Sequence, residues 1–512
     1  ATNLQSHPAA VRLSDIINDI QVVQLTGPWD AKIVGITTDS RAVQPGWMFV
    51  ATEGAHTDGH RFVQSAMERG ASCVVVQLPQ YESSLHQLLT PAYCQHNGTT
   101  VVVVHDTRIA TAVLADRFYG SPSRDMVMIG VTGTNGKTTF TYLLSSVLEA
   151  AGIRSGMIGT VAYRIGNEHR PAFFTTPPAE SLHALLAEMR EAGCTSVVME
   201  VSSHALALAR VHGIGFDVSV FMNLTQDHLD FHGSMEVYRD AKARLFDPYT
   251  RGTALINADD PAAPYMGKKL GRRRRTFGTR PRSTYRIKNI DASVLGTAID
   301  VVHDGTVYQI ASPLIGRFNA WNIAAAFAAG VELGFMPGTV IRGIEQLQTI
   351  PGRYERIVSM DGVTAIVDYS HTPDSLEKAL HTARDIADGG RVITVFGCGG
   401  DRDQAKRPLM GAVSTRRSDI TVVTSDNPRS EHPGAIISDI LAGTVSGARV
   451  VKRVQRRAAI QYALKIARPG DIVLVAGKGH ESYQIIGNTR RHFDDREIVR
   501  RYFDEHRGGI QA

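Results

Sequence analysis

The sequence predicts an α/β protein built from three domains, and three observations predict it. Short apolar runs typical of buried parallel strands alternate with helical stretches along most of the chain, which is the pattern of βαβ units. A glycine-rich turn stands between one such strand and a helix. The chain has 512 residues, enough for three domains at roughly 150 residues each.

The first predicted domain covers residues 1–106 and is a small α/β unit. Its β-like runs, CVVVQ at 73–77 and TVVVVHD at 100–106, alternate with helical stretches such as HRFVQSAMERG at 60–70. The stretch 107–120, TRIATAVLADRFYG, then predicts an amphipathic helix that opens the second domain.

The second predicted domain covers residues 107–350. Its buried strands are expected within MVMIGVTG (126–133), SVVMEVSS (196–203), VSVFMNL (218–224) and TALINADD (253–260). An alanine-rich run at 318–334 predicts a helix that ends at a glycine. Proline and glycine in TIPGRYE, residues 349–355, mark the boundary to the third domain.

The third predicted domain covers residues 351–512. Four more strands are expected within TAIVDYS (364–370), RVITVFGCGG (391–400), DITVVTSDNP (419–428) and DIVLVAGKGH (471–480). Each run ends in glycine or polar residues. Because ligands of open α/β sheets gather at the carboxyl ends of the strands, these tails are candidate binding segments.

The composition is that of a soluble cytoplasmic protein. No apolar run approaches the roughly 20 residues that span a bilayer, and the first residues lack the features of a signal peptide. The four cysteines stand far apart without a C-x-x-C pair, which favours reduced thiols over disulfides or a zinc cluster: Cys73, Cys94, Cys194 and Cys398.

The formal net charge is +5, which suits anionic ligands. The densest basic run, residues 268–278, lacks the further basic and aromatic support of a nucleic-acid patch. We therefore expect a solvated loop there and no nucleic-acid partner.

The stretch GVTGTNGKTTF, residues 130–140, resembles a phosphate-binding loop although Val131 stands where the strict pattern has its first glycine. The loop lies between a predicted strand and a predicted helix, where backbone N–H groups and the helix N-terminus favour phosphate oxygens. Lys137 can neutralise phosphate charge and the Thr138 hydroxyl can bind Mg²⁺. These features predict a nucleoside triphosphate site.

Further ligands for Mg²⁺ can come from two other strand ends. Glu200 ends a buried strand, where a carboxylate is costly without a partner. The segment NLTQDHLDFHGS offers Asp227, His228, Asp230 and His232 after another strand. By composition alone, this second cluster is equally compatible with a polar surface.

Eleven motifs occur in one order: TGTNGKTT, TTP, MEVSSH, DHLDFHG, YRDAK, FNAWN, PGRYE, DYSHTPDSL, FGCGGDRDQAKRP, DNPR and VAGKGHE. Together they closely resemble the Mur ligases, the ATP-dependent amide-forming enzymes of peptidoglycan precursor synthesis. The resemblance spans nearly the whole chain. The GTNGKTT loop alone fits any member, folylpolyglutamate synthetases included, whereas the C-terminal motifs resemble the diaminopimelate-adding members.

The resemblance implies a UDP-sugar-binding N-terminal domain, a central ATPase domain with a P-loop-type sheet, and a Rossmann-like C-terminal domain that binds an amino acid. It implies ATP-dependent addition of meso-2,6-diaminopimelate to UDP-N-acetylmuramoyl-L-alanyl-D-glutamate through an acyl phosphate, in the cytoplasm. We expect a monomer without a membrane span that uses ATP as substrate and Mg²⁺ as cofactor.

The resemblance also implies the residues of the ATP site. Thr138 and Glu200 match the family's first magnesium site and His228 the second. Lys242 matches a lysine that family members carry as a carbamate, N6-carboxylysine, although the sequence alone predicts an ordinary helix-surface lysine. Lys137, Glu200, His228 and Lys242 are the expected catalytic set. The matching ATP contacts are Gly133, Thr134, Asn135, Gly136, Lys137, Thr138, Thr139, Asn322, Arg353 and Asp368.

Two further sets follow from the resemblance. The UDP-muramoyl-peptide positions are Thr38, Ser40, Ala55, His56, Thr57, Thr175, Thr176, Ser202 and Arg210. The diaminopimelate positions are Arg402, Asp426, Asn427, Pro428, Arg429, Gly477 and Glu481. Arg429 suits the carboxylate that distinguishes diaminopimelate from lysine, because a guanidinium binds a carboxylate with two parallel hydrogen bonds. On the residues alone, DNPR is more typical of a turn.

Two alternatives stay open at this point. A sibling ligase, adding lysine or extending folate with glutamate, would share the ATPase. A nucleotide-dependent regulatory or scaffold protein would bind ATP without ligation, and it would not need Glu200, His228 and Lys242 beside the loop.

Overall fold

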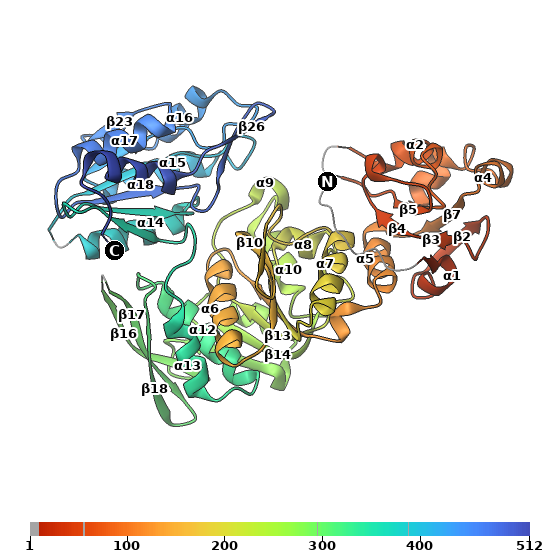
Figure 1. Ribbon diagram of the computed structural model, residues 1–512, viewed down its shortest axis with the longest axis horizontal. Coiled ribbons are helices and arrows are strands. Elements are labelled where there is room, and N and C mark those ends of the chain that lie inside the picture. The colour runs from red at the N-terminus through yellow and green to blue at the C-terminus, as the bar shows by residue number, and fades with distance from the viewer. Residues whose placement is uncertain (1–9, 55–56, 294, 388, 512) are drawn as a thin grey trace. The chain divides into compact units, whose positions relative to one another are not determined.

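The computed structural model describes residues 10–54, 57–293, 295–387 and 389–511 (Figure 1). The chain divides into two compact units. The first comprises Ala1–Gly130, Ile153–Ser219 and Ala241–Gly252, and the second comprises Val131–Gly152, Val220–Asp240 and Thr253–Ala512. The domain boundaries at residues 106 and 350 stay a prediction.

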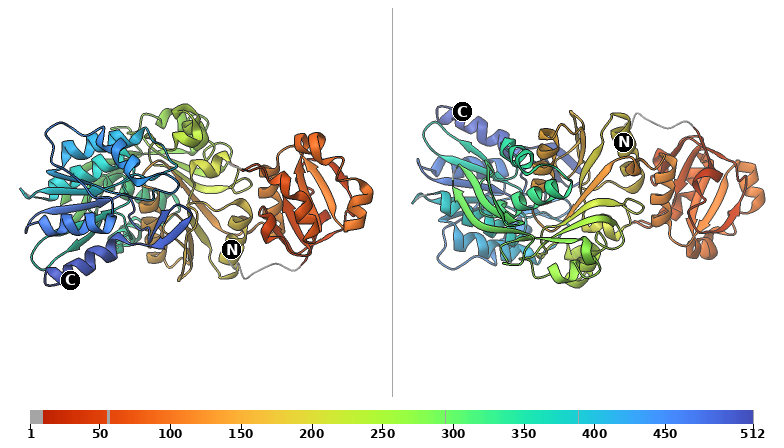
Figure 2. Two further views of the ribbon diagram at one scale, coloured as in Figure 1. Left: turned by 90° about the horizontal axis from the view of Figure 1, so that it is seen from above. Right: turned by 90° about the horizontal axis from the view of Figure 1, so that it is seen from below.

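The N-terminal part of the first unit is a five-stranded sheet in the order β2-β7-β6-β5-β4, with helices on both faces (Figure 2). Along β6, Cys73 and Val75 pack with α1 and α5, whereas Val74 and Val76 pack with α2 and α4, as the alternation of a strand requires. The strands and helices predicted for this part of the chain, and the helix after them, are confirmed. The elements are β1 Val11–Arg12, α1 Leu13–Ile16, β2 Val22–Thr26, β3 Lys32–Ile33, β4 Gly35–Thr37, η1 Ser40–Ala42, β5 Trp47–Val50, η2 Gly59–Phe62, α2 Val63–Glu68, β6 Cys73–Gln77, α3 Leu78–Gln80, η3 Tyr81–Leu85, α4 Pro91–Asn97, β7 Thr100–Val104, α5 Thr107–Phe118 and η4 Pro122–Arg124.

The central sheet has eleven strands in the order β11-β10-β9-β12-β8-β13-β14-β15-β16-β17-β18. The predicted strands at 126–133, 196–203, 218–224 and 253–260 are confirmed as β8, β12, β13 and β14. Antiparallel strands extend both edges, and no pattern in the sequence predicted these. The bounds are β8 Val127–Thr132, β9 Ser155–Ile158, β10 Ala162–Ile165, β11 Glu168–Pro171, β12 Ser196–Glu200, β13 Phe216–Phe221, β14 Thr250–Asn257, β15 Arg274–Gly278, β16 Tyr285–Ser293, β17 Gly296–His303 and β18 Thr306–Ser312.

The helix after the glycine-rich turn, α6, packs closely against α13 in the second unit. A Cβ on Gly343 of α13 would lie 2.4 Å from the Val147 Cα of α6, so this helix contact requires a glycine. The alanine-rich run forms the predicted helix, α12. The bounds of the helices in this part of the chain are α6 Lys137–Ala150, α7 Ala179–Glu191, α8 Ser203–Ala207, α9 Leu229–His232, α10 Met235–Ala243, α11 Ala263–Met266, η5 Gly271–Arg273, α12 Asn319–Glu332 and α13 Pro337–Gln346.

The basic run at residues 268–278 is not wholly the solvated loop that its charge predicted. Its second half is β15, which pairs in parallel with β14 and β16. The expectation fails because Phe277 is fully buried and anchors the segment in the sheet, while the arginines before it are exposed or half-buried.

The C-terminal sheet has the order β19-β20-β24-β21-β22-β23 and lies in the second unit. Ile472, Leu474 and Ala476 of β24 face α14, α15 and α16, whereas Val473 and Val475 face α17 and α18. The four predicted strands are confirmed as β20, β21, β22 and β24, parallel along the sheet. The bounds are β19 Glu355–Val358, β20 Thr364–Asp368, α14 Pro373–Ile386, β21 Val392–Phe396, α15 Lys406–Arg417, β22 Ile420–Val423, α16 Pro433–Leu441, β23 Val450–Lys452, α17 Arg456–Ile466, β24 Ile472–Ala476, β25 Tyr483–Ile486, β26 Thr489–His492 and α18 Asp495–His506.

Across the described ranges, no helix combines the length and apolar character needed to cross a membrane. All four cysteines are buried and free, with no disulfide between them. Burial raises the pKa of the Cys398 thiol to about 12, so this side chain stays protonated.

Candidate active site

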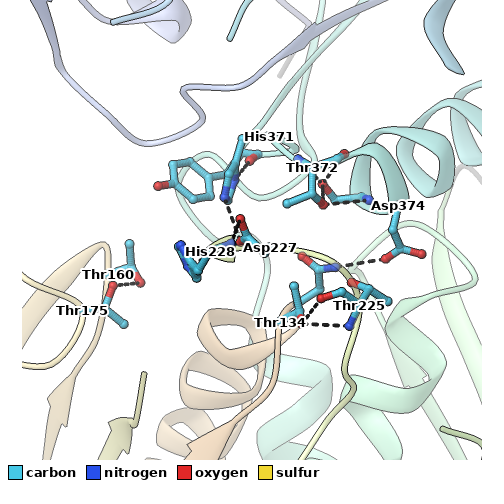
Figure 3. A network of polar contacts seen from close by, with 12 residues as sticks. Thr134, Thr160, Thr175, Thr225, Asp227, His228, His371, Thr372 and Asp374 are labelled. Atoms are coloured by element: carbon cyan, nitrogen blue, oxygen red, sulfur yellow. Dashed lines mark hydrogen bonds and ion pairs between the residues drawn. The ribbon is translucent and has the colours of Figure 1, made fainter. Parts of the chain in front are cut away.

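The glycine-rich turn between β8 and α6 is anchored to the segment that follows β13 (Figure 3). The Thr134 hydroxyl donates to the Thr225 carbonyl and accepts from the Thr225 N–H, both at 3.0 Å. Asn135 N donates to Asn223 Oδ1 at 2.9 Å, and Asn223 Nδ2 donates back to the Asn135 carbonyl. These reciprocal hydrogen bonds fix the turn that precedes α6.

Lys137 is the first residue of α6, and its ammonium folds back over the turn. Nζ donates to the Gly133 carbonyl at 2.8 Å and to the Thr134 carbonyl at 3.0 Å. The N-cap residue is Gly136, which has no side chain that could cap the helix N-terminus. A cation and an uncapped helix start therefore lie together, as phosphate binding requires.

Asn322 lies directly beside this turn. A Cβ on Gly136 would lie 2.5 Å from Asn322 Oδ1, and Gly136 has a φ of +89°. Asn322 Nδ2 donates to Asn319 Oδ1 at 2.8 Å, which fixes the orientation of the amide. The two predicted ATP residues are thus in contact, and only a glycine fits between the turn and α12.

Arg353 also reaches the start of α6. Its Nη2 donates to the Thr138 hydroxyl at 2.9 Å, and its guanidinium lies 4.4 Å from the centre of the Tyr369 ring. Gly352, just before it, approaches His480 so closely that a Cβ would lie 1.9 Å from the His480 backbone nitrogen. The segment around Arg353 therefore contacts two segments of the C-terminal part, the one that follows β20 and the one that follows β24.

Asp368, at the end of β20, accepts hydrogen bonds that fix the backbone next to Arg353. Oδ1 accepts from the Tyr354 N–H at 2.7 Å, and Oδ2 accepts from the Ser370 N–H at 2.9 Å and from the Ser370 hydroxyl. Tyr354 has a φ of +50°, an unfavourable region for a tyrosine, and the carboxylate stabilises it there.

Asp227 lies between two imidazoles, which Figure 3 shows directed at its carboxylate. Its Oδ2 is 3.4 Å from His228 Nε2 and 3.6 Å from His371 Nε2. Burial alone would raise the pKa of the Asp227 carboxyl, but His371, His228 and Lys406 outweigh it and hold that pKa well below its usual range. His371 was missed as a site residue, although its DYSHTP motif was a signal.

In the first unit, Glu200 ends β12 with its carboxylate buried. Oε1 accepts from the Thr160 N–H at 2.9 Å and Oε2 accepts from the Thr160 hydroxyl at 3.0 Å. The same hydroxyl lies 3.0 Å from Thr175 Oγ1 (Figure 3). Thr160 therefore links Glu200, the predicted metal ligand, to Thr175, a predicted muramoyl-peptide residue. Nothing in the sequence indicated a role for Thr160.

Three other predicted substrate residues surround the same strand end. The Thr176 hydroxyl donates to the Glu200 carbonyl at 2.7 Å and accepts from the Ser202 N–H at 3.1 Å. Arg210 Nη1 donates to the Thr176 carbonyl at 2.8 Å. Burial lowers the pKa of the Arg210 guanidinium, against the pull of Glu180.

The remaining substrate positions lie in the N-terminal part of the chain. The Thr38 hydroxyl donates to Glu180 Oε1 at 2.8 Å, while burial raises the pKa of the Glu180 carboxyl. Ser40 begins η1 and is half-buried, and Thr57 is exposed. Ala55 and His56 lie outside the described residues.

Lys242 lies on α10 and is 1% exposed. The expectation of an ordinary helix-surface lysine, which the sequence alone favoured, is therefore wrong. The helix turns this position inward, where a charged group is kept only if its surroundings compensate the cost of burial. Burial agrees with the carbamate that the resemblance implied.

Three of the four predicted magnesium ligands are hard oxygen donors that fit Mg²⁺, namely a threonine hydroxyl, a carboxylate and a carbamate, whereas His228 offers an imidazole nitrogen. Glu200 and Lys242 belong to the first unit and Thr138 and His228 to the second, so the complete set stays a prediction. Within the described residues no group of three His, Cys, Asp or Glu side chains could hold a metal ion. Only two of the four predicted ligands, Glu200 and His228, are of these residue types.

The predicted amino-acid residues converge after β22 and β24. Asn427 Nδ2 donates to Glu481 Oε2 at 2.9 Å, and a Cβ on Gly477 would lie 2.8 Å from Asp426 Oδ2. Arg429, which follows Pro428, has a φ of +52°, and its Nη1 donates to the Gly400 carbonyl at 2.8 Å.

Two guanidinium groups stand close together at this site. Burial and then the nearby Arg402 guanidinium lower the pKa of Arg429. Both side chains approach Gly399, where a Cβ would lie 2.9 Å from Arg429 Nη1 and 3.7 Å from Arg402 Cγ. Two cations held together in this way favour an anionic group as their ligand.

A separate pocket of about 520 Å³ lies between α12 and the antiparallel extension of the central sheet. No predicted site residue lines it. Tyr285 and His303 stack there at 4.1 Å, and the Tyr285 hydroxyl donates to Glu332 Oε1 at 2.8 Å.

Three family models match the chain. They are the Mur ligase family, catalytic domain, over residues 32–119, the Mur ligase middle domain over residues 131–330, and the Mur ligase, glutamate ligase domain, over residues 352–479.

Similar proteins cover nearly the whole chain. The UDP-N-acetylmuramoyl-L-alanyl-D-glutamate–2,6-diaminopimelate ligase of Geobacter metallireducens is 43% identical over 97% of this chain and 99% of its own length. The ligase of the same name from Synechococcus elongatus is 45% identical over 92% of this chain and 94% of its own. A solved structure of such a ligase matches with a TM-score of 0.67 at 32% identity, covering 97% of this chain and 99% of its own. These matches confirm the expected three-domain α/β architecture, and the chain belongs to the Mur ligase family.

Proposed function

We propose that this protein is an ATP-dependent ligase that joins meso-2,6-diaminopimelate to UDP-N-acetylmuramoyl-L-alanyl-D-glutamate. The observation that carries the proposal is the convergence of Arg429, Asn427 and Glu481, which sets a guanidinium, an amide and a carboxylate side by side. An amino acid with two ammonium and two carboxylate groups needs such a combination. The curated relatives, named for this reaction, support the same substrate.

The reaction needs ATP because a carboxylate and an amine do not condense unaided in water. The substrate carboxylate attacks the γ-phosphorus, the bond to the β-phosphate oxygen breaks, and ADP leaves with an acyl phosphate formed. The amine then attacks the acyl carbon, a tetrahedral intermediate expels inorganic phosphate, and the nitrogen loses a proton. Lys137 and the N–H groups of the turn bind and orient the phosphates, and Arg353 adds positive charge beside Thr138.

Mg²⁺ is the cofactor of this proposal. Thr138, Glu200, His228 and carbamylated Lys242 would hold it, and when bound it supplies charge neutralisation for the phosphate oxygens. The buried lysine and the buried glutamate support this assignment.

The nucleotide-sugar peptide is assigned to the first unit. Thr38 and Ser40, with the loop 55–57, would contact the UDP part. Thr175, Thr176, Ser202 and Arg210 would hold the muramoyl peptide, and the half-buried Arg210 suits one of its carboxylates. The enzyme would act in the cytoplasm as a monomer, with small-molecule substrates and no nucleic-acid or membrane partner.

A product assay tests the proposal against the sibling ligases. The protein is incubated with ATP, Mg²⁺, the UDP-muramoyl dipeptide and, in separate reactions, meso-diaminopimelate, L-lysine or other amino acids. A further reaction contains a folate and glutamate. We expect UDP-tripeptide, ADP and phosphate only with diaminopimelate, whereas a comparable kcat/KM for lysine or a folate product would refute the assignment.

A further inference from the structure

Lys478 is the buried residue of the GKGHE segment that follows β24. Its side chain is fully buried, and its ammonium donates to Glu481 Oε2 at 2.9 Å and to Asn427 Oδ1 at 3.2 Å. The Tyr483 ring lies 5.4 Å from Nζ. A buried ammonium is kept only where partners compensate it, and both hydrogen-bond partners here are predicted amino-acid-binding residues.

The contact with Lys478 also fixes the orientation of the Asn427 amide. Asn427 Oδ1 accepts from Lys478 and from the Ile485 N–H at 2.9 Å, so the oxygen faces two donors. The other end, Nδ2, is therefore directed at an acceptor, and it donates to Glu481 Oε2. Lys478, Asn427 and Glu481 form a closed network in which each orientation supports the other two.

Within the described residues, the hydrogen bonds that Glu481 accepts both fall on Oε2. Oε1 is therefore the oxygen that Glu481 can present to a substrate ammonium. We infer that Lys478 is a positioning residue for the amino-acid substrate: it holds Glu481 Oε2 and Asn427 Oδ1 so that Oε1 meets the incoming ammonium group. This inference rests on the proposed function.

Two physical roles for Lys478 predict opposite results. If only its charge mattered, removing a cation beside Glu481 would strengthen the attraction of the carboxylate for a substrate ammonium and lower KM. If positioning matters, the freed Glu481 and Asn427 side chains would rotate and KM would rise. The direction of the change therefore separates the two roles.

The variants are Lys478→Met and Lys478→Gln, with Lys465→Met on the exposed face of α17 as the matched control. We expect KM for diaminopimelate to rise about tenfold or more in Lys478→Met. KM for ATP and for the UDP-dipeptide should stay unchanged, and kcat should fall less than KM rises. Lys478→Gln, which keeps a donor, should show a smaller increase.

A double variant tests whether Lys478 acts through Glu481. Lys478→Met combined with Glu481→Gln should have the KM of Glu481→Gln alone, because the first substitution has nothing left to position. Independent, multiplying effects would overturn the inference, as would an unchanged or lowered KM in Lys478→Met. If neither single variant folds at the assay temperature, Lys478 is structural and the inference also fails. Wild-type activity with diaminopimelate would leave the proposed function standing in each case.

Discussion

The Arg353 guanidinium donates to the Thr138 hydroxyl at 2.9 Å although 215 residues separate them in the chain. Thr138 begins the helix after the phosphate-binding turn, and Arg353 precedes the C-terminal sheet. The contact brings a positive charge to the place where the turn is expected to bind phosphate. The same Thr138 hydroxyl is the oxygen that we assign to Mg²⁺.

Replacing Arg353 by methionine should lower kcat/KM for ATP by about 10²-fold or more, because it removes a charge aimed at the developing phosphate charge. Steady-state kinetics with varied ATP measure the loss. The control is Arg356→Met, an exposed arginine three positions along the chain. A change of less than threefold in Arg353→Met would contradict the assignment.

Gly136→Ala should abolish nucleotide binding, because the new methyl group would overlap Asn322 Oδ1 and distort the turn. Gly152→Ala is the matched control, since Gly152 also has a positive φ, +73°, but nothing lies within 4 Å of its Cβ position. Calorimetric titration with an ATP analogue measures binding, and thermal unfolding measures stability. Equal binding by both variants would show that the close contact is unimportant.

Arg429→Ala should erode the preference for meso-diaminopimelate over L-lysine. A half-buried guanidinium left without its carboxylate is penalised, so the wild-type preference should be on the order of 10⁴ or more. The loss should appear mainly in KM for diaminopimelate. Arg416→Ala, an exposed arginine on α15, should leave the preference intact. Similar wild-type kcat/KM for the two amino acids would refute the idea.

Lys242→Ala should abolish turnover, because the substitution removes both the lysine and its carbamate. Added short carboxylates, such as acetate, should restore part of the activity by supplying the missing oxygens. Wild-type activity should also depend on bicarbonate. Near-normal activity of Lys242→Ala at low bicarbonate would exclude the carbamate.

His183 on α7 predicts a pH dependence of stability. It is fully buried 3.5 Å from Asp116 Oδ1, and burial lowers its pKa to about 4 while the carboxylate acts in the opposite direction. Between its unfolded value near 6.5 and about 4, the unfolded chain binds a proton that the folded chain does not. The free energy of unfolding should therefore fall as pH falls, by up to about 1.4 kcal/mol per pH unit.

Urea unfolding between about pH 7 and about pH 5 measures this slope, and His183→Gln should flatten it. The exposed histidine on α14 provides the control, His381→Gln, which should keep the wild-type slope. An identical slope in His183→Gln would assign the pH dependence to other groups.

The sequence predicted what depends on local pattern. The buried strands that end at Glu200 and Asp368 are apolar runs between glycines and polar residues. The turn before Lys137 is recognisable by the spacing of its glycines and the lysine. The antiparallel strands β16–β18 were missed because their half-exposed residues show neither a clear alternation nor a buried run.

Tertiary contacts account for the other differences. Lys242 is turned inward by packing that no helix periodicity reveals, and Lys478 shows its role only beside Asn427, 51 residues earlier in the chain. Thr160 contacts Glu200, and Glu180 contacts Thr38, because the fold brings distant segments together. The sequence around Thr160 and Glu180 carries no motif. A single sequence therefore shows which segments bear chemistry, but it does not show which neighbour orients each group.

The close approach of Gly352 to His480 has a consequence for how ligand affinities are linked. Arg353 adjoins one side of this backbone contact, and Lys478 and Glu481 flank the other, with no room for a side chain between. A shift of the His480 backbone would therefore displace the Gly352 backbone, next to the arginine that contacts Thr138. Any factor by which a bound amino acid changes nucleotide affinity through this contact must equal the factor by which the nucleotide changes amino-acid affinity.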